Sequence, residues 1–196
     1  MAKSVEFLYD FVSVPCYIAW KHIEVVAGQA NAQVEMTPVF CQGIFNAVGN
    51  PGPLAVPAKR EWYARDLELW VKKRNIPYRS NPNNPIRSLP LMRGVFVAEE
   101  RGEIDHYIRT IFEAIYVHCR NMSDIETVRS TLAEEGFDAE SYLKGVERDD
   151  LKLKLRRNTD QAVARGVFGV PTFFVGDQLF FGQDRLEFVR DALMAL

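Results

Sequence analysis

Ser13 is the residue of this sequence best placed to stabilise a reactive anion. It begins the segment Ser13-Val14-Pro15-Cys16, between an apolar run and a stretch with helical periodicity. Proline is tolerated in the first turn of a helix, so Pro15 indicates that a helix begins here. The unpaired N–H groups and the dipole of a helix N-terminus favour a bound anion, which the Ser13 hydroxyl could also contact. The alternative is that Ser13 only caps the helix.

Val170-Pro171 is a second candidate, because this proline interrupts a strong strand pattern. Proline has no backbone N–H and is normally confined to strand edges or bulges. A trans proline on an edge strand would need no further role. The other possibility is a cis proline, which would leave the backbone of Val170 free to pair with an extended peptide ligand. We predict the cis form.

Polar residues in three further places could face the same ligand. Asp184 precedes the last helix and could cap it together with Glu187, or could face the ligand together with Arg185. Asn50 lies on a proline-rich loop, and Lys59 follows that loop. Taken singly, such residues are usually solvated surface side chains.

No metal site is expected, because the three histidines are scattered and the three cysteines form no Cys-x-x-Cys pair. The odd, sparse cysteine count and the lack of a signal-peptide pattern predict reduced thiols and a cytoplasmic location. Cys16 shares an apolar helical face with Ala19, Trp20, Ile23 and Ala27. We therefore expect its thiol to be partly buried and unreactive, as packing one turn below Ser13.

The charge balance argues against a nucleic-acid-binding protein. Lys and Arg number 24 and Asp and Glu number 26, a formal net charge of -2, whereas such proteins normally carry a basic excess. No stretch approaches the about 18 apolar residues that span a membrane. The 196 residues, 47% of them hydrophobic, fit one globular domain or a small domain with an insertion.

The elements that must position Ser13 form a strand–helix–strand unit. Residues 5–11 have the apolar alternation of a mostly buried strand, and the helix that follows extends to about Gly28. Residues 33–39 form the second strand. This order predicts a parallel pair joined by a crossover helix.

The middle of the chain gives mostly helical signals, without a convincing strand between Phe45 and Leu151. Turn formers at 49–53 and a Pro/Asn-rich break at 81–90 interrupt the helices. We interpret residues 46–151 as an all-helical insertion.

The last part of the chain returns to a mixed α/β pattern. Residues 151–165 read as a helix, two apolar runs around Gly176-Asp177 read as a β-hairpin, and residues 184–195 read as a closing helix. The whole order, βαβ, helical insertion and αββα, predicts a thioredoxin-like fold. Residues 1–45 and 152–196 would form the thioredoxin-like domain.

Five motifs, in order along the chain, resemble those of a known family. They are Asp10-Phe11-Val12-Ser13; Asn50-Pro51-Gly52-Pro53 with Pro57, Lys59, Tyr63 and Asp66; Pro82-Asn83-Asn84 with Leu91-Met92-Arg93-Gly94; Phe168-Gly169-Val170-Pro171-Thr172; and Phe181-Gly182-Gln183-Asp184-Arg185-Leu186. Nearly from end to end, the chain is similar to the 2-hydroxychromene-2-carboxylate isomerases, relatives of the kappa-class glutathione transferases. Each motif alone is weak, but five in the right order are fairly specific.

The resemblance implies a glutathione-dependent enzyme. Ser13 would occupy the position of the first thioredoxin cysteine and hydrogen-bond the glutathione thiolate. Val170 would pair with the cysteinyl unit beside cis-Pro171. By the same resemblance, the γ-glutamyl end would be bound by Gln183, Asp184 and Arg185. The cofactor and the substrate would be contacted by Asn50 and Lys59, and the substrate also by Asn84.

The reaction that the resemblance implies is thiolate addition to a conjugated double bond, rotation about the resulting single bond, and elimination. A free thiol has a pKa near ~8.5, and lowering it by ~2 units takes ~2.7 kcal/mol. A hydrogen bond to a charged group contributes about 1.5–3 kcal/mol and a helix N-terminus roughly 0.3–1 kcal/mol, enough without a histidine base. We expect a small aromatic or conjugated substrate and a homodimer.

Two departures from the family keep other functions open. The chain has Ser-Val-Pro-Cys at residues 13–16, where the family has Ser-Pro-x-Ser, and apolar residues 54–56, where naphthalene-pathway members carry polar substrate contacts. A kappa-class-like transferase or a thiol-disulfide oxidoreductase using Cys16 is therefore the alternative. Ser13 argues against disulfide exchange, because that chemistry needs an attacking thiolate. A third possibility is a glutathione-binding protein without catalysis.

Overall fold

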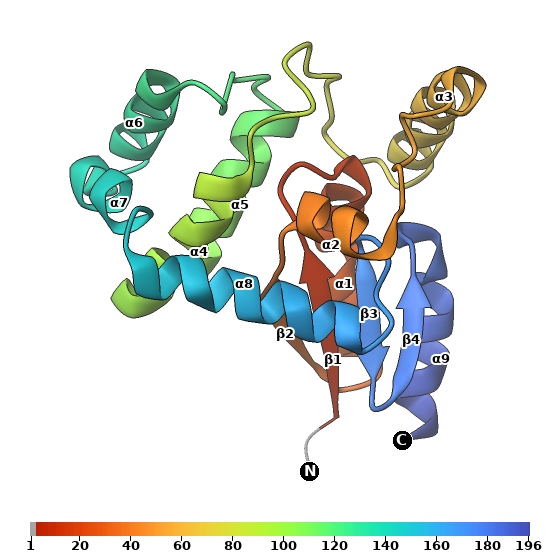
Figure 1. Ribbon diagram of the computed structural model, residues 1–196. Coiled ribbons are helices and arrows are strands. Elements are labelled where there is room, and N and C mark those ends of the chain that lie inside the picture. Colours follow the sequence, from red (N-terminus) through yellow and green to blue (C-terminus); the bar gives the residue numbers. More distant parts are fainter. Residues whose placement is uncertain (1–2) are drawn as a thin grey trace.

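A four-stranded sheet organises the computed structural model, which describes residues 3–196 (Figure 1). The strands are β1 (Ser4–Tyr9), β2 (Gln33–Pro38), β3 (Thr172–Val175) and β4 (Gln178–Phe181), in the spatial order β2-β1-β3-β4. β1 pairs with β2 in parallel and with β3 antiparallel, and β3 pairs with β4 antiparallel. The predicted thioredoxin-like fold is confirmed, although β1 ends two residues before the predicted Phe11.

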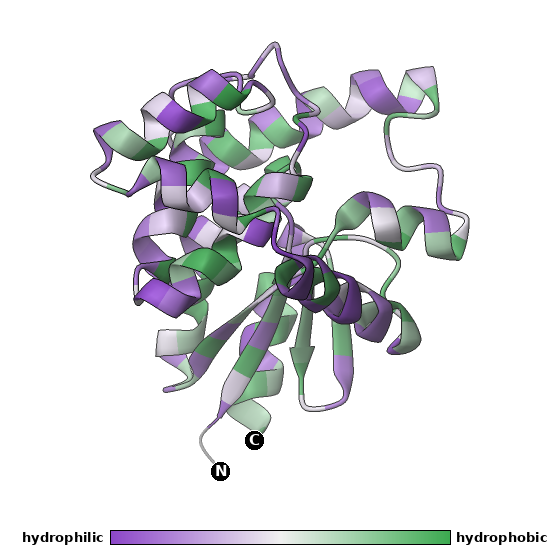
Figure 2. Ribbon diagram, turned by 60° about the vertical axis from the view of Figure 1, so that its left-hand side comes forward, coloured by the Kyte–Doolittle hydropathy of each residue, from purple (hydrophilic) through white to green (hydrophobic). Residues whose placement is uncertain are grey.

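Helices cover both faces of this sheet, which explains why β3 and the second half of β1 are continuously buried. α1 (Val14–Gln29) packs with α9 (Leu186–Ala195) on one face, and α2 (Cys41–Val48) packs with α8 (Asp149–Ala164) on the other (Figure 1). In Figure 2 the helices alternate between hydrophobic and hydrophilic stretches along their length, as expected for helices buried on one side.

The middle of the chain is helical, as predicted. It contains α3 (Pro57–Lys73), α4 (Leu89–Arg101), α5 (Ile104–Tyr116), α6 (Ile125–Glu134) and α7 (Ala139–Gly145). α4 to α7 gather on one side of the molecule, and α3 lies apart from them (Figure 1). No helix within residues 3–196 is both long and apolar enough to cross a membrane.

α2 was not predicted, and the predicted boundary after residue 45 falls inside it. Its N-cap, Phe40, provides no capping side chain. Instead, the N–H of Phe40 donates to Thr159 Oγ1 at 3.0 Å, and the N–H of Cys41 donates to Asp10 Oδ2 at 2.8 Å. Because both acceptors are distant in sequence, the local pattern gives no sign of this helix start.

One aromatic cluster joins the sheet to the helical insertion. The ring of Phe112, on α5, lies 4.8 Å from that of Phe11 and 5.2 Å from that of Trp20, measured between centroids. Tyr9 and Tyr17 pack on the same ring. The hydrophobic core is therefore continuous between β1, α1 and α5.

Candidate functional site

Ser13 is the N-cap of α1, and its Oγ accepts a hydrogen bond from the N–H of Cys16 at 3.2 Å. The side chain is only partly buried. A hydroxyl accepting one hydrogen bond keeps its own O–H to donate. Capping and anion binding are therefore compatible in Ser13, although the sequence analysis treated them as alternatives.

Asp10 stabilises the Ser13 turn through hydrogen bonds from the backbone of the turn. It is fully buried, its Oδ1 accepts from the N–H of Val12 at 3.1 Å, and its backbone carbonyl accepts from the N–H of Ser13 at 3.1 Å. Its Oδ2 accepts from the N–H of Cys41, so one carboxylate connects the turn to the start of α2. Burial raises the pKa of Asp10, and the two backbone hydrogen bonds oppose that rise. The sequence analysis gave Asp10 no role, although an acidic residue closing a buried strand is a usable signal.

Cys16 is fully buried, more deeply than the predicted partial burial. Burial raises its pKa to about 12, although its hydrogen bond with Ser13 acts in the opposite direction. Cys41 is also buried, and burial raises its pKa too. Neither thiol is therefore ionised near neutral pH, which agrees with a packing role for Cys16.

The Val170-Pro171 peptide bond is cis, as predicted. On either side of it, Thr172 Oγ1 donates to the carbonyl of Gly169 at 2.7 Å, and the N–H of Gly182 donates to the carbonyl of Pro171 at 2.9 Å. Within residues 3–196, Val170 itself makes no backbone–backbone hydrogen bond. Its N–H and C=O therefore have no backbone partner, although only 8% of Val170 is exposed.

Asn50 attaches the proline-rich loop to the Val170 segment. Its Nδ2 donates to the carbonyl of Phe168 at 2.9 Å, and its Oδ1 accepts from the N–H of Gly52 at 2.9 Å. The predicted ligand residue therefore lies beside the predicted ligand strand, and both of its amide atoms already have partners.

An aromatic surface that the sequence analysis missed lies next to Val170. The rings of Phe168 and Phe181 have centroids 4.5 Å apart, and these residues are 42% and 41% exposed. Phe45, on α2, completes the group, because a side chain built on Gly169 would touch the rings of both Phe45 and Phe181. The Phe168 and Phe181 rings are tilted by 50° to each other and exposed, and Phe45 is partly buried, so the group offers apolar aromatic surface to another flat apolar group.

Gln183, Asp184 and Arg185 form a 3-10 turn before α9. Of the two alternatives for Asp184, capping of the last helix is wrong, because α9 begins at Leu186 after Arg185 and has no side-chain cap. Asp184 and Arg185 are exposed and form an ion pair of 3.5 Å, whereas Gln183 is buried. Both charged side chains are thus available to a ligand.

No hydrogen bond or ion pair within residues 3–196 joins Lys59 or Asn84 to this group. Lys59 is exposed in the first turn of α3. Asn84 Oδ1 accepts from the N–H of Ile86 at 3.2 Å, within a loop organised by the buried Asn81. No structural role was predicted for Asn81 from the sequence.

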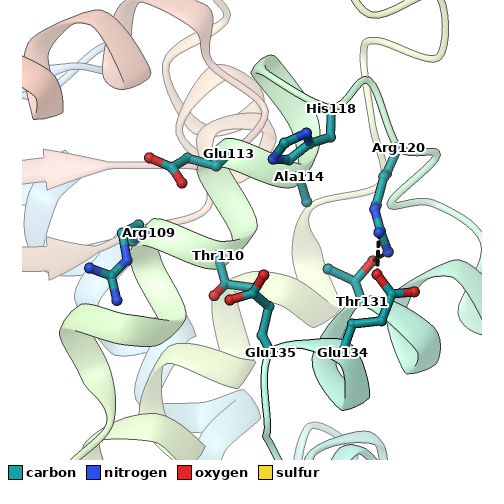
Figure 3. Close-up of a pocket in the computed structure, with 9 residues that line it drawn as sticks. All are labelled: Arg109, Thr110, Glu113, Ala114, His118, Arg120, Thr131, Glu134 and Glu135. Atoms are coloured by element: carbon teal, nitrogen blue, oxygen red, sulfur yellow. Dashed lines mark hydrogen bonds and ion pairs between the residues drawn. The ribbon is translucent and has the colours of Figure 1, made fainter. Parts of the chain in front are cut away.

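Two of the cavities within residues 3–196 lie away from Ser13 and Val170. One, of about 250 Å³, lies between α5 and α6, and its charges pair in part with each other, as in Arg120 with Glu134 (Figure 3). The other, of about 280 Å³, lies between β2, α4 and α8. Neither brings together the predicted site residues. Within residues 3–196, no three His, Cys, Asp or Glu side chains are grouped as metal ligands.

Comparison with known proteins extends over almost the whole chain. The model of the DSBA-like thioredoxin domain family matches residues 4–194. A 2-hydroxychromene-2-carboxylate isomerase of Sphingobium xenophagum is 26% identical, over 99% of this chain and 100% of that protein. Glutathione S-transferase kappa 2 of Caenorhabditis elegans is also 26% identical, over 97% of this chain and 92% of that protein. A solved structure of 2-hydroxychromene-2-carboxylate isomerase superposes with a TM-score of 0.85 at 24% identity, covering 97% of this chain and 94% of that one.

Proposed function

The chain belongs to the DSBA-like thioredoxin domain family, and from this premise we propose that it is a glutathione-dependent isomerase of a conjugated, aromatic carboxylate such as 2-hydroxychromene-2-carboxylate. The observation that carries the proposal is Ser13 at the N-terminus of α1, with a hydroxyl proton left to donate. A serine in this place stabilises a thiolate brought by a ligand without itself exchanging disulfides.

Glutathione fits the groups around Ser13. The free backbone of Val170 suits the cysteinyl unit of an extended peptide. The exposed Asp184 and Arg185 offer a negative and a positive charge for the α-amino and α-carboxylate groups of the γ-glutamyl end. No thiol of this chain is needed, which agrees with the raised pKa of Cys16.

Each residue would have a separate task. Bound glutathione supplies the nucleophilic thiolate for reversible addition to the conjugated double bond. The Ser13 hydroxyl donates a hydrogen bond to that sulfur, worth about 1.5–3 kcal/mol to the charged form. The N-terminus of α1 adds roughly 0.3–1 kcal/mol. Asp10 holds the turn so that the hydroxyl keeps its direction.

The aromatic surface of Phe45, Phe168 and Phe181 supports an aromatic substrate. It lies beside Val170 and includes Phe168, whose carbonyl accepts the hydrogen bond from Asn50 of the proline-rich loop. We propose that the substrate ring stacks there, with Asn50, Lys59 and Asn84 as polar contacts on the substrate side. We also propose that the enzyme acts in the cytoplasm as a homodimer, with its cysteines as free thiols.

A kappa-class-like glutathione transferase is the second candidate. It is favoured by the exposed apolar residues Leu54 and Val56, which suit a hydrophobic electrophile without a carboxylate. Disulfide exchange through Cys16 is disfavoured, because its thiol is buried and protonated.

The test is turnover of 2-hydroxychromene-2-carboxylate with and without glutathione, with 1-chloro-2,4-dinitrobenzene as a transferase substrate in parallel. Isomerisation only when glutathione is present supports the proposal. Conjugation without isomerisation would favour the transferase. Calorimetric titration with glutathione separates a binding protein from both enzymes, since tight binding without either turnover indicates a binder.

A further inference from the structure

Arg74 connects the end of α3 to the turn formed by Gln183, Asp184 and Arg185. Arg74 is the C-cap of α3, and its Nη2 donates a hydrogen bond of 2.8 Å to the backbone carbonyl of Gln183. The two residues are 109 positions apart in the chain. The guanidinium also lies over the ring of Trp70, 4.9 Å from the centroid. Stacking and hydrogen bond together fix the direction of the guanidinium plane.

The surroundings of this link are buried and charged. Gln183 is only 5% exposed, and Arg74 Nη1 is buried without a hydrogen-bond partner in the described part of the chain. Burial lowers the pKa of Arg74, while the carboxylates of Asp184 and Glu187 act to raise it. Together with burial, the charge of Arg74 lowers the pKa of His22, on α1. The guanidinium thus lies where α1, α3 and the turn meet.

α3 packs on the core along one side only, through Leu67 and the partly buried Tyr63, Trp70 and Val71. Of its residues, all within the described range, only Leu67 is buried, and Trp62 and Leu69 are exposed. The hydrogen bond from Arg74, the C-cap residue, links the C-terminal end of α3 to the turn. A hydrogen bond from a charged donor is stronger than one between neutral groups.

We propose that Arg74 is a positioning residue for the γ-glutamyl end of glutathione. By holding the carbonyl of Gln183, it fixes the turn that presents Asp184 and Arg185 at a set separation. This inference rests on the proposed glutathione site. It assigns to that site a residue of α3 that does not itself touch the ligand.

The experiment compares Arg74→Met with Lys73→Met in calorimetric titrations of glutathione and of cysteinylglycine, which lacks the γ-glutamyl unit. Lys73 is a matched control, since its Nζ also lies 4.9 Å from the Trp70 centroid but does not bond the turn. For Arg74→Met we expect about tenfold weaker binding of glutathione, because one charge-assisted hydrogen bond is lost. The affinity for cysteinylglycine should change little. Lys73→Met should bind both ligands like the wild type. In turnover, KM for glutathione should rise while kcat at saturation stays unchanged.

Three outcomes would overturn the inference. Wild-type affinity for glutathione in Arg74→Met removes the role, and an equal loss for both ligands indicates general damage to the site. Failure of the wild type to bind glutathione instead overturns the proposed function, and this inference with it. Thermal unfolding of each variant checks the fold. If Arg74→Met does not fold, Arg74→Lys keeps the charge without the planar fork, and it should still weaken only glutathione binding.

Discussion

We propose that Ser13 combines two tasks on one side chain, capping α1 and binding a ligand, and that their energetic contributions differ enough to be measured by substitution. Its oxygen accepts from the N–H of Cys16 and thereby caps α1. Its hydrogen is left for a ligand. A substitution that keeps the hydroxyl should preserve both tasks, and one that removes it should lose both by different amounts.

We expect Ser13→Ala to lower turnover ten- to a hundredfold, because about 1.5–3 kcal/mol of thiolate stabilisation is lost. The missing cap should cost about 1 kcal/mol of folding free energy. Ultraviolet titration of bound glutathione should show a raised thiolate pKa. Ser13→Thr keeps a hydroxyl that can cap and donate, and should stay close to the wild type. An unchanged thiolate pKa in Ser13→Ala would falsify the catalytic role.

Cys16→Ser should keep most of the activity. Burial raises the pKa of Cys16 to about 12, so its thiol is protonated at neutral pH and takes no part in nucleophilic chemistry. The modest cost is to stability, about 1 kcal/mol, because a hydroxyl replaces a thiol in an apolar place. With iodoacetamide at neutral pH, the less buried Cys119 should react before Cys16 and Cys41. Rapid labelling of Cys16 with loss of activity would instead point to a redox enzyme.

At the scale of elements, the turn that carries Ser13 is linked through Asp10 to α2, a helix that flanks this turn on neither side. Asp10 accepts from the N–H of Val12 in the turn and from that of Cys41 in α2. Burial makes the ionised carboxylate costly, and the two bonds repay only a part of that cost, since the net effect is a raised pKa.

This raised pKa fixes the sign of a pH dependence. A group whose pKa is higher in the folded than in the unfolded chain binds protons more readily when folded, so its contribution to stability grows as the pH falls. We therefore expect the unfolding free energy of the wild type, relative to Asp10→Asn, to increase between neutral pH and the ordinary aspartate pKa of about 3.9. Urea unfolding of both proteins at several pH values measures it. If the difference in unfolding free energy between the wild type and Asp10→Asn shrinks on acidification, the hydrogen bonds to Asp10 lower its pKa by more than burial raises it.

The sequence predicted the elements whose cause is local. The alternation of residues 5–11, Pro15 in the first turn of α1 and the Gly176-Asp177 turn act over a few residues, and each element is present. α2 and the true start of α9 were missed. The N–H groups at the start of α2 are satisfied by Asp10 and Thr159, which no local pattern connects to Cys41.

The candidate site follows the same rule. The cap at Ser13 and the cis bond before Pro171 could be predicted from neighbouring residues. The bond from Asn50 to Phe168 joins residues 118 positions apart, and that from Arg74 to Gln183 joins residues 109 apart. Such contacts depend on the packing of whole elements. The order of the motifs therefore pointed to Asn50 and Gln183 as site residues, but it did not predict the hydrogen bonds that they make.

At the scale of the whole molecule, the thioredoxin-like part and the helical insertion share one core. Phe112 belongs to α5 of the insertion, yet its ring packs on Phe11 and Trp20 of the first unit. Tyr116, also on α5, donates from its hydroxyl to the carbonyl of Phe11 at 2.8 Å, two residues before Ser13. The insertion thus contacts the segment that leads into the Ser13 turn, and we expect that the two parts do not unfold separately.

Phe112→Ala tests this coupling, because the ring is fully buried where the two parts meet. Truncating a buried phenylalanine typically costs about 3–5 kcal/mol, so the urea midpoint should fall strongly. Because the core is continuous, far-ultraviolet circular dichroism and tryptophan fluorescence should still report one coincident transition in the wild type and the variant. Phe188→Ala is the control, since Phe188 is 55% exposed on α9 and its loss should cost far less. Two separate transitions, only one of them shifted by Phe112→Ala, would mean that the insertion folds as an independent domain and that the Ser13 turn does not depend on it.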